Sequence, residues 1–152
     1  MNTAYVGLGA NLGDRERTLR RALALLDDRE GVVVAAVSTL RETAPVGYLD
    51  QPSFLNGAAR LETELPPRQL LRLLLDVELE LGRDRSGPRF GPRTVDLDLL
   101  VYGDVELDEP DLAVPHRRLH ERRFALEPLA ELAPGLVVPR RGPVERLLAE
   151  LD

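Results

Sequence analysis

The chain has 152 residues, 26 acidic and 20 basic side chains, a formal net charge of −6 and no cysteine. The missing cysteine excludes disulfides and thiolate metal sites, and because every basic residue is arginine, a P-loop lysine and a lysine Schiff base are excluded too. The acidic balance argues against a nucleic-acid partner, and without a long apolar run or a signal-like start we expect a cytoplasmic protein with no membrane partner.

The first half of the chain predicts a β-α-β-β order. An alternating segment at 3–9 predicts a strand, followed by a helix that Asn11 or Asp14 can cap and that ends near Gly31. Apolar β-branched residues predict a strand at 32–40. A loop with proline and glycine at 41–53 and an alternating strand at 54–63 follow.

The second half predicts a helix, a strand and a C-terminal extension. Proline in the first turn and Gly82 just past the end predict a helix at 67–81. An arginine-rich loop at 83–93 leads to a strand at 94–102. The extension then has a short strand near 105–107, a basic turn at 116–123, and helices near 124–132 and at 143–151. The class is α+β, and the order predicts a ferredoxin-like βαββαβ two-layer sandwich with a C-terminal extension, in one domain over 1–152.

Two aspartates stand in the strand at 94–102. Alternation predicts that Val95, Leu97, Leu99 and Val101 face the core, and that Asp96, Asp98, Leu100 and Tyr102 face the other way. The two carboxylates then point the same way, with Cα atoms roughly 6.6–7 Å apart. One way to offset their repulsion is a hard cation between them, usually Mg²⁺ with substrate phosphates. A solvated strand face is the commoner reading of such a pair, but aspartate is depleted in strands and Leu100 and Tyr102 indicate a covered face, which favours a cleft.

Two arginine clusters flank this strand. Four arginines lie within 83–93 beside one acid, and HRRLHERR at 116–123 contains both histidines; each segment has a net charge of +3. Arginines beside a carboxylate pair fit phosphoryl transfer. Taken alone, each cluster is better explained as a solvated charge run, and for His116 a structural role is as compatible with the sequence as a functional one. Asn56, on an otherwise apolar strand, needs hydrogen-bond partners if it is buried.

Three runs, FGPRTVDLDLLVYGD, VPHRRLHERRFALEPLAELAP and TAPVGYLDQPSFLNGAARLET, resemble the 6-hydroxymethyl-7,8-dihydropterin pyrophosphokinase family of folate biosynthesis. The resemblance covers essentially the whole chain in order. It implies Mg²⁺-dependent transfer of pyrophosphate from ATP to the hydroxymethyl group of the dihydropterin, with release of AMP. Arg117 departs from the family pattern, which has Pro or Tyr there, and Phe90 stands where some relatives have Trp.

The resemblance also implies roles for individual residues. Asp96 and Asp98 hold two Mg²⁺ ions, and Arg83 and Arg93 act with them in catalysis by contacting the phosphates. The implied ATP site comprises Glu78, Arg83, Arg93, Leu99, His116 and Arg122. The implied pterin pocket comprises Thr43, Ala44, Val46, Phe54, Asn56 and Phe124, with the two phenylalanines sandwiching the ring and Asn56 reading its edge.

Two other classes of function remain open from the residues. A ferredoxin-like regulatory module could bind a small molecule without catalysis, since a fold alone does not decide function. A metal-dependent phosphohydrolase or nuclease could use the same two carboxylates, with water as the acceptor. We expect small-molecule substrates and a monomer.

Overall fold

The computed structural model describes residues 1–44, 53–82 and 95–152. Its elements in chain order are β1 (Asn2–Ala10), α1 (Arg15–Asp27), β2 (Val32–Val37), β3 (Arg41–Thr43), β4 (Phe54–Thr63), α2 (Pro67–Glu80), β5 (Asp96–Tyr102), β6 (Leu107–Glu109), β7 (Leu112–Val114), a 3₁₀ turn (Leu119–Glu121), α3 (Arg123–Leu132), β8 (Val137–Val138), β9 (Gly142–Pro143) and α4 (Val144–Ala149).

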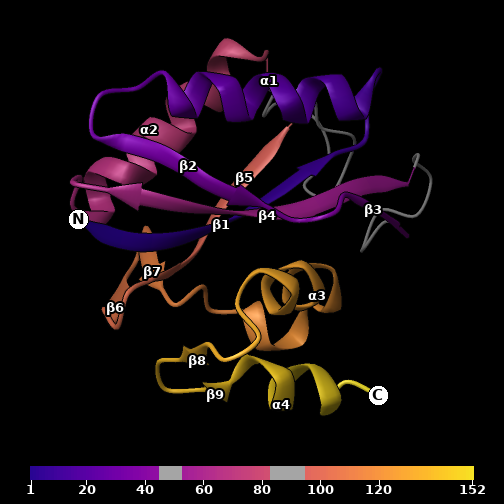
Figure 1. Cartoon of the computed structure of the whole chain (residues 1–152), viewed down its shortest axis with the longest axis vertical. Helices are drawn as coiled ribbons and strands as arrows, with labels where there is room; N and C mark the ends of the chain where they lie inside the picture. Colours follow the sequence, from indigo (N-terminus) through magenta and orange to yellow (C-terminus); the bar gives the residue numbers. More distant parts are fainter. Residues whose placement is uncertain (45–52, 83–94) are drawn as a thin grey trace.

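The centre of the molecule is a five-stranded antiparallel sheet in the order β2-β4-β1-β5, with β3 pairing to β4. Helices α1 and α2 lie against one face, and α3 and α4 lie on the opposite side of the sheet (Figure 1). The predicted mixed class, an antiparallel sheet with helices, is confirmed. The C-terminal extension covers the second face of the sheet and so forms a third layer.

Helix boundaries follow local sequence signals. Asp14 caps α1 by accepting a hydrogen bond from the backbone N–H of Arg17 (3.2 Å), and Pro67 begins α2. Gly82, directly after the C-cap of α2, has a positive φ of 82°, and Gly31, in the turn between α1 and β2, has a φ of 84°. The predicted starts of both helices are confirmed, whereas α1 ends at Asp27, before Gly31, and α2 ends at Glu80.

Two apolar clusters lie on opposite faces of the sheet. The first joins the inward faces of β1, β4 and β5 to α1 and α2, with Leu19, Leu61 and Leu74 fully buried. The second joins Tyr5, Leu100 and the C-terminal helices, including Leu126 and Leu129. At about 25 cal/mol per Å² of buried apolar area, these clusters are the main source of stability.

A β-bulge on β5 corrects the predicted alternation. Val6 of β1 pairs with Leu99, yet the preceding residue Tyr5 pairs with Val101, so Leu100 is an extra residue on β5. The alternation therefore holds up to Leu100 and then changes phase. Val101 packs in the second cluster and Tyr102 in the first, opposite to the faces predicted for them.

The predicted loop at 41–53 was wrong at its start, because Arg41–Thr43 is the edge strand β3. The strand expected at 32–40 ends at Val37, and the one near 105–107 begins at Leu107 and pairs with β7. These short strands depend on pairing with distant residues, which local periodicity does not reveal. The predicted loop at 83–93 lies outside the described residues.

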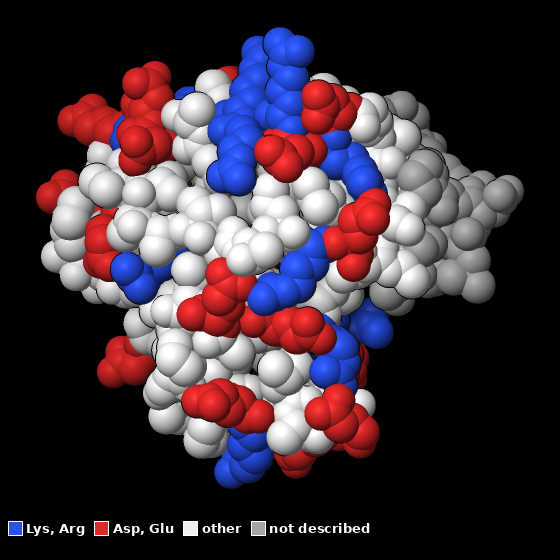
Figure 2. Space-filling model, turned by 45° about the vertical axis from the view of Figure 1, so that its right-hand side comes forward, with Lys and Arg blue, Asp and Glu red and all other residues white. Residues whose placement is uncertain are grey.

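Exposed arginines pair with acidic side chains from distant segments. Arg68 of α2 donates to Asp111 (2.8 Å) and Glu109, and Figure 2 shows acidic side chains beside basic ones across one face. Exposed pairs of this kind each contribute about 0–1 kcal/mol, so they matter less than the apolar clusters. None of the helices in the described ranges has the length and apolar character that crossing a membrane requires.

Candidate functional site

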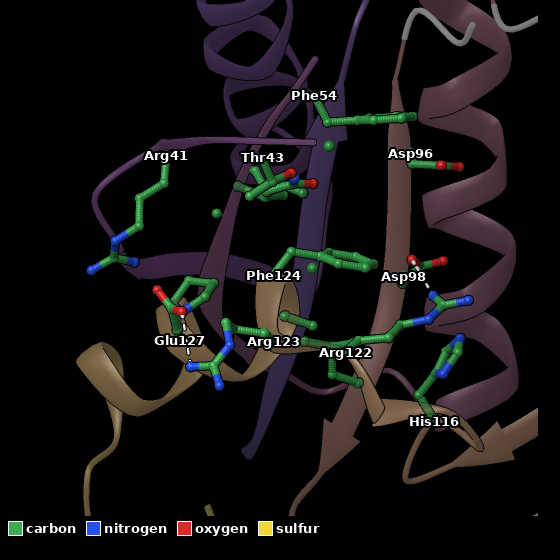
Figure 3. Close-up of a pocket in the computed structure, with 18 of the residues that line it drawn as sticks. Arg41, Thr43, Phe54, Asp96, Asp98, His116, Arg122, Arg123, Phe124 and Glu127 are labelled. Atoms are coloured by element: carbon green, nitrogen blue, oxygen red, sulfur yellow. Dashed lines mark hydrogen bonds and ion pairs between the residues drawn. The ribbon is translucent and has the colours of Figure 1, made fainter. Parts of the chain in front are cut away.

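A cavity of about 730 Å³ lies on the second face of the sheet, between the strands and the start of α3 (Figure 3). Strands β1, β4 and β5 form its floor, β3 lies on one side, and the segment 116–128 lies on the other. The predicted site residues that line it are Thr43, Ala44, Phe54, Asn56, Asp96, Asp98, His116, Arg122 and Phe124.

Glycines keep the floor of this cavity open. Gly7 pairs with Asp98, and Gly9 lies between Asn56 on one neighbouring strand and Asp96 on the other. A Cβ atom on Gly9 would come within 2.8 Å of Oδ1 of Asn56. Only glycine therefore leaves the Asn56 amide and the backbone of β1 accessible at this point.

Asp96 and Asp98 both line the cavity and project from the same side of β5 (Figure 3). Nη1 of Arg122 lies 4.0 Å from Oδ2 of Asp98, whose side chain is 41% exposed. The two aspartates therefore lie in a cleft beside a guanidinium. The sequence predicted such a cleft from the apolar residues on the same strand face.

The donor set at this position fits a hard cation that arrives with a phosphate ligand. Across residues 1–44, 53–82 and 95–152 there is no group of three His, Cys, Asp or Glu side chains that could hold an ion by itself. Mg²⁺ is typically bound by one or two carboxylates, with substrate phosphates and water as further ligands. Asp96 and Asp98 provide those two carboxylates.

The other part of the cavity is a flat apolar slot with a polar edge. Thr43 pairs with Phe54 across β3 and β4, and Nδ2 of the buried Asn56 donates to Oγ1 of Thr43. Phe54 and Phe124 extend into the cavity in the same direction (Figure 3). The guanidinium of Arg122 lies 5.6 Å from the centre of the Phe124 ring, within the range of a cation–π contact. Arg122 therefore connects the slot to the two aspartates.

Glu131 of α3 holds the two sides of this slot together. Its carboxylate accepts from the backbone N–H of Thr39 (2.8 Å) and from Nη2 of Arg41 (2.7 Å). The Thr39 N–H, followed by Arg41, keeps the pKa of Glu131 below its usual range. Arg41 begins β3, so the strand that carries Thr43 is tied to the helix that carries Phe124.

His116 is tied to β5 and is uncharged at neutral pH. Its backbone N–H donates to the carbonyl of Leu100 (2.9 Å), and its Nδ1 accepts from the N–H of Arg118 (3.1 Å). Burial, together with the charges of Arg122, Arg118 and Arg117, lowers the pKa of His116 to about 4. With Nδ1 acting as an acceptor, the neutral ring carries its proton on Nε2 and can donate there.

We expect the buried His116 to make the protein less stable in mild acid. His116 binds a proton near pH 6.5 in the unfolded chain but only near pH 4 in the folded protein. The free energy of unfolding therefore has its full value above pH 6.5 and decreases as the pH falls from 6.5 to 4. The parent protein should lose on the order of 3 kcal/mol of unfolding free energy across that window, and His116→Gln should not show this loss. Urea denaturation at several pH values measures it, and equal slopes for both proteins would contradict this expectation.

Two predicted ATP-site residues lie outside the lining of the cavity. Leu99 packs in the first apolar cluster, and Glu78 is 2% exposed, with Oε2 accepting from the backbone N–H of Leu97 (2.8 Å). Arg83, Arg93 and Val46 lie outside the described residues, so their placement in the site remains a prediction.

Several lining residues were not predicted: Gly7, Gly9, Arg41, Arg118, Arg123 and Glu127. The two glycines are two residues apart in the strand predicted at 3–9, so the sequence already indicated that they share one face of it. Arg41 was missed because β3 was predicted as a loop. Arg123, which pairs with Glu127 (3.5 Å) and Asp152, depends on tertiary contacts that local patterns do not contain.

Comparisons with known proteins show the family to which this chain belongs. The model of the family 7,8-dihydro-6-hydroxymethylpterin-pyrophosphokinase (HPPK) matches residues 5–134. A 2-amino-4-hydroxy-6-hydroxymethyldihydropteridine pyrophosphokinase of Bacillus subtilis is 50% identical over 131 residues, 86% of this chain and 78% of that protein. The protein of the same name from Methylorubrum extorquens is 43% identical over 152 residues, 100% of this chain and 95% of that protein.

Longer proteins also contain a matching region. The mitochondrial folate synthesis bifunctional protein of Arabidopsis thaliana is 46% identical over 127 residues, 84% of this chain but 23% of that protein. A crystal structure of Plasmodium falciparum HPPK-DHPS superposes with a TM-score of 0.75 at 17% identity, covering 98% of this chain and 44% of that one. At that identity, the likeness shows a shared fold.

Proposed function

Because the chain belongs to the 7,8-dihydro-6-hydroxymethylpterin-pyrophosphokinase family, we propose that it transfers pyrophosphate from ATP to the hydroxymethyl group of 6-hydroxymethyl-7,8-dihydropterin. The other product is AMP, and the reaction belongs to folate biosynthesis. One observation supports the substrate assignment most directly. A single cavity joins a flat aromatic slot that has an amide at its edge to a pair of carboxylates beside an arginine.

The slot suits a flat heterocycle with amide-like edges. Phe54 and Phe124 provide aromatic faces for stacking, and Asn56 provides a donor and an acceptor whose orientation Thr43 fixes. Ala44 adds a small apolar contact at the same end. In this proposal Val46 completes the pterin pocket.

Pyrophosphoryl transfer depends mainly on positioning and on neutralising charge. Asp96 and Asp98 would hold two Mg²⁺ ions, which when bound neutralise the charge of the transferred phosphates. Arg122, at the junction of the slot and the carboxylates, and His116, donating through Nε2, would bind phosphate oxygens. Arg83 and Arg93 complete the proposed phosphate contacts.

We further propose that residues 1–152 form one ferredoxin-like βαββαβ domain with a C-terminal layer. The sheet order β2-β4-β1-β5, with α1 and α2 on one face, supports this arrangement. A monomeric, cytoplasmic enzyme with small-molecule substrates remains our prediction, and sedimentation velocity tests the monomer.

A nucleotide assay tests the reaction. We expect protein, Mg²⁺ and ATP to form AMP only when the dihydropterin alcohol is added, with one AMP per pyrophosphorylated pterin. Formation of ADP would contradict the proposal. Hydrolysis of ATP without the pterin would identify a phosphohydrolase instead, and pterin binding without any turnover would identify a regulatory module.

A further inference from the structure

Glu78 is a buried carboxylate away from the cavity lining, in the second half of α2. It is 2% exposed, and its neighbours on the same helix face, Leu74 and Val77, are fully buried in the first apolar cluster. Burying a carboxyl group is costly unless hydrogen bonds satisfy it. A well-packed apolar side chain would serve packing equally well at this position, so a carboxylate here calls for a specific reason.

The hydrogen bond of Glu78 supplies that reason. Its Oε2 accepts from the backbone N–H of Leu97 at 2.8 Å, and both groups are buried. Leu97 stands between Asp96 and Asp98, so the bonded peptide group belongs to the segment that carries both carboxylates. Glu78 therefore holds one of the two peptide groups that lie between the aspartates, the one that joins Asp96 to Leu97.

The position of β5 in the sheet explains why this bond matters. Strand β5 is at the end of the path β2-β4-β1-β5 and pairs with β1 on one side. Backbone groups on the other side of an edge strand need partners outside the sheet. On that strand, Glu78 accepts from the Leu97 N–H, and the carbonyl of Leu100 accepts from the His116 N–H (2.9 Å). These two bonds fix the strand on either side of Asp98.

We propose that Glu78 is a positioning residue for the reaction: it sets the orientation of Asp96 and Asp98 through the Leu97 N–H. The Leu97 N–H belongs to the peptide group that joins Asp96 to Leu97. Rotation of that group would tilt the Asp96 side chain directly and would shift Asp98 through the next peptide of the strand. This inference rests on the proposed function for its catalytic meaning. Loss of such a supporting partner in metal sites costs about 10–100-fold in metal affinity or activity.

Three variants separate positioning from packing. Glu78→Met keeps the length and volume of the side chain but removes the oxygen acceptor. Glu78→Gln keeps an oxygen acceptor of nearly the same shape without the charge. Leu74→Ala, one turn earlier on the same buried face, removes packing and leaves the Leu97 bond intact.

Two measurements do not require turnover. Hydrogen exchange of the Leu97 amide, followed by NMR, reports the bond directly. Mn²⁺ binding in the presence of a non-hydrolysable ATP analogue, followed by electron paramagnetic resonance, reports the carboxylate pair. We expect Glu78→Met to accelerate Leu97 exchange and to weaken Mn²⁺ binding about tenfold or more, with kcat falling similarly. Pterin affinity should change by less than about twofold, since that slot lies on other strands.

The other variants give the matched comparison. Glu78→Gln should retain Mn²⁺ affinity within about threefold of the parent, because the acceptor remains. Leu74→Ala should lower the melting temperature without weakening Mn²⁺ binding. Parent-like Mn²⁺ binding by Glu78→Met would overturn the inference, and so would equal weakening by Leu74→Ala or Glu78→Gln. If the parent protein formed no AMP, the proposed function would fail, whereas the exchange and Mn²⁺ measurements would still decide the role of Glu78.

Discussion

Replacing Asp96 with alanine is expected to lower turnover by about 10³-fold or more, which corresponds to about 4 kcal/mol of transition-state stabilisation. The reason is that the cavity offers two carboxylates, Asp96 and Asp98, as charged oxygen donors on β5. Removing one would leave a single carboxylate to hold the cations that neutralise the phosphates. Initial rates of AMP formation at saturating Mg²⁺ measure the effect, and Asp98→Ala should behave similarly.

The fold and the pterin slot should survive this substitution. Asp96 is at the start of β5 and lines a cavity, so its loss creates no void in either apolar cluster. Asp104→Ala, in the exposed turn after the same strand, is the matched control and should keep full activity. An Asp96→Ala protein with more than a tenth of the parent rate would remove the proposed metal role.

Replacing Asn56 with alanine is expected to weaken binding of the dihydropterin about 100-fold, while affinity for an ATP analogue changes by less than about threefold. Asn56 is 7% exposed and is the amide at the edge of the slot, held by the Thr43 hydroxyl. Without it, the polar edge of a bound ring would be desolvated against apolar groups. Titration calorimetry with each ligand separately measures the difference.

The control for Asn56 is another asparagine. Asn2→Ala, at the exposed start of β1, should leave both affinities unchanged. A fall in the affinity for the ATP analogue equal to the fall in pterin affinity would show that Asn56 supports the whole cavity and does not read the ring. Unchanged pterin affinity would place the ring elsewhere.

The fold was predictable where local signals decide it. Asp14 and Pro67 mark the starts of α1 and α2 by capping chemistry and backbone geometry, and Gly82 marks the end of α2. The edge strand β3 was not predictable, since three residues become a strand only by pairing with β4. The change of phase at Leu100 was equally hidden, because a bulge depends on the register with β1.

The site likewise has a part that local sequence predicts and a part that depends on tertiary contacts. Period-two alternation predicted that Asp96 and Asp98 share a face, and the excess charge drew attention to 116–123. Within that segment it was the family resemblance that implied a role for His116 and Arg122. The contact of Arg122 with both Phe124 and Asp98 required the second face of the sheet to be covered by α3, which no local pattern specifies. The bond from Leu97 to Glu78 joins positions 19 residues apart, on a strand and a helix, and is a tertiary property.

The tie between Glu131, Thr39 and Arg41 has a thermodynamic consequence for ligand recognition. It links β3, which carries Thr43, to α3, which carries Phe124, before any ligand arrives. Hydrogen bonds within the chain therefore set the width of the aromatic slot. A flat ring that enters the slot orders few additional side chains. Preorganisation of this kind lowers the conformational entropy lost on association, so affinity at this end of the cavity comes from complementarity to a slot that already exists.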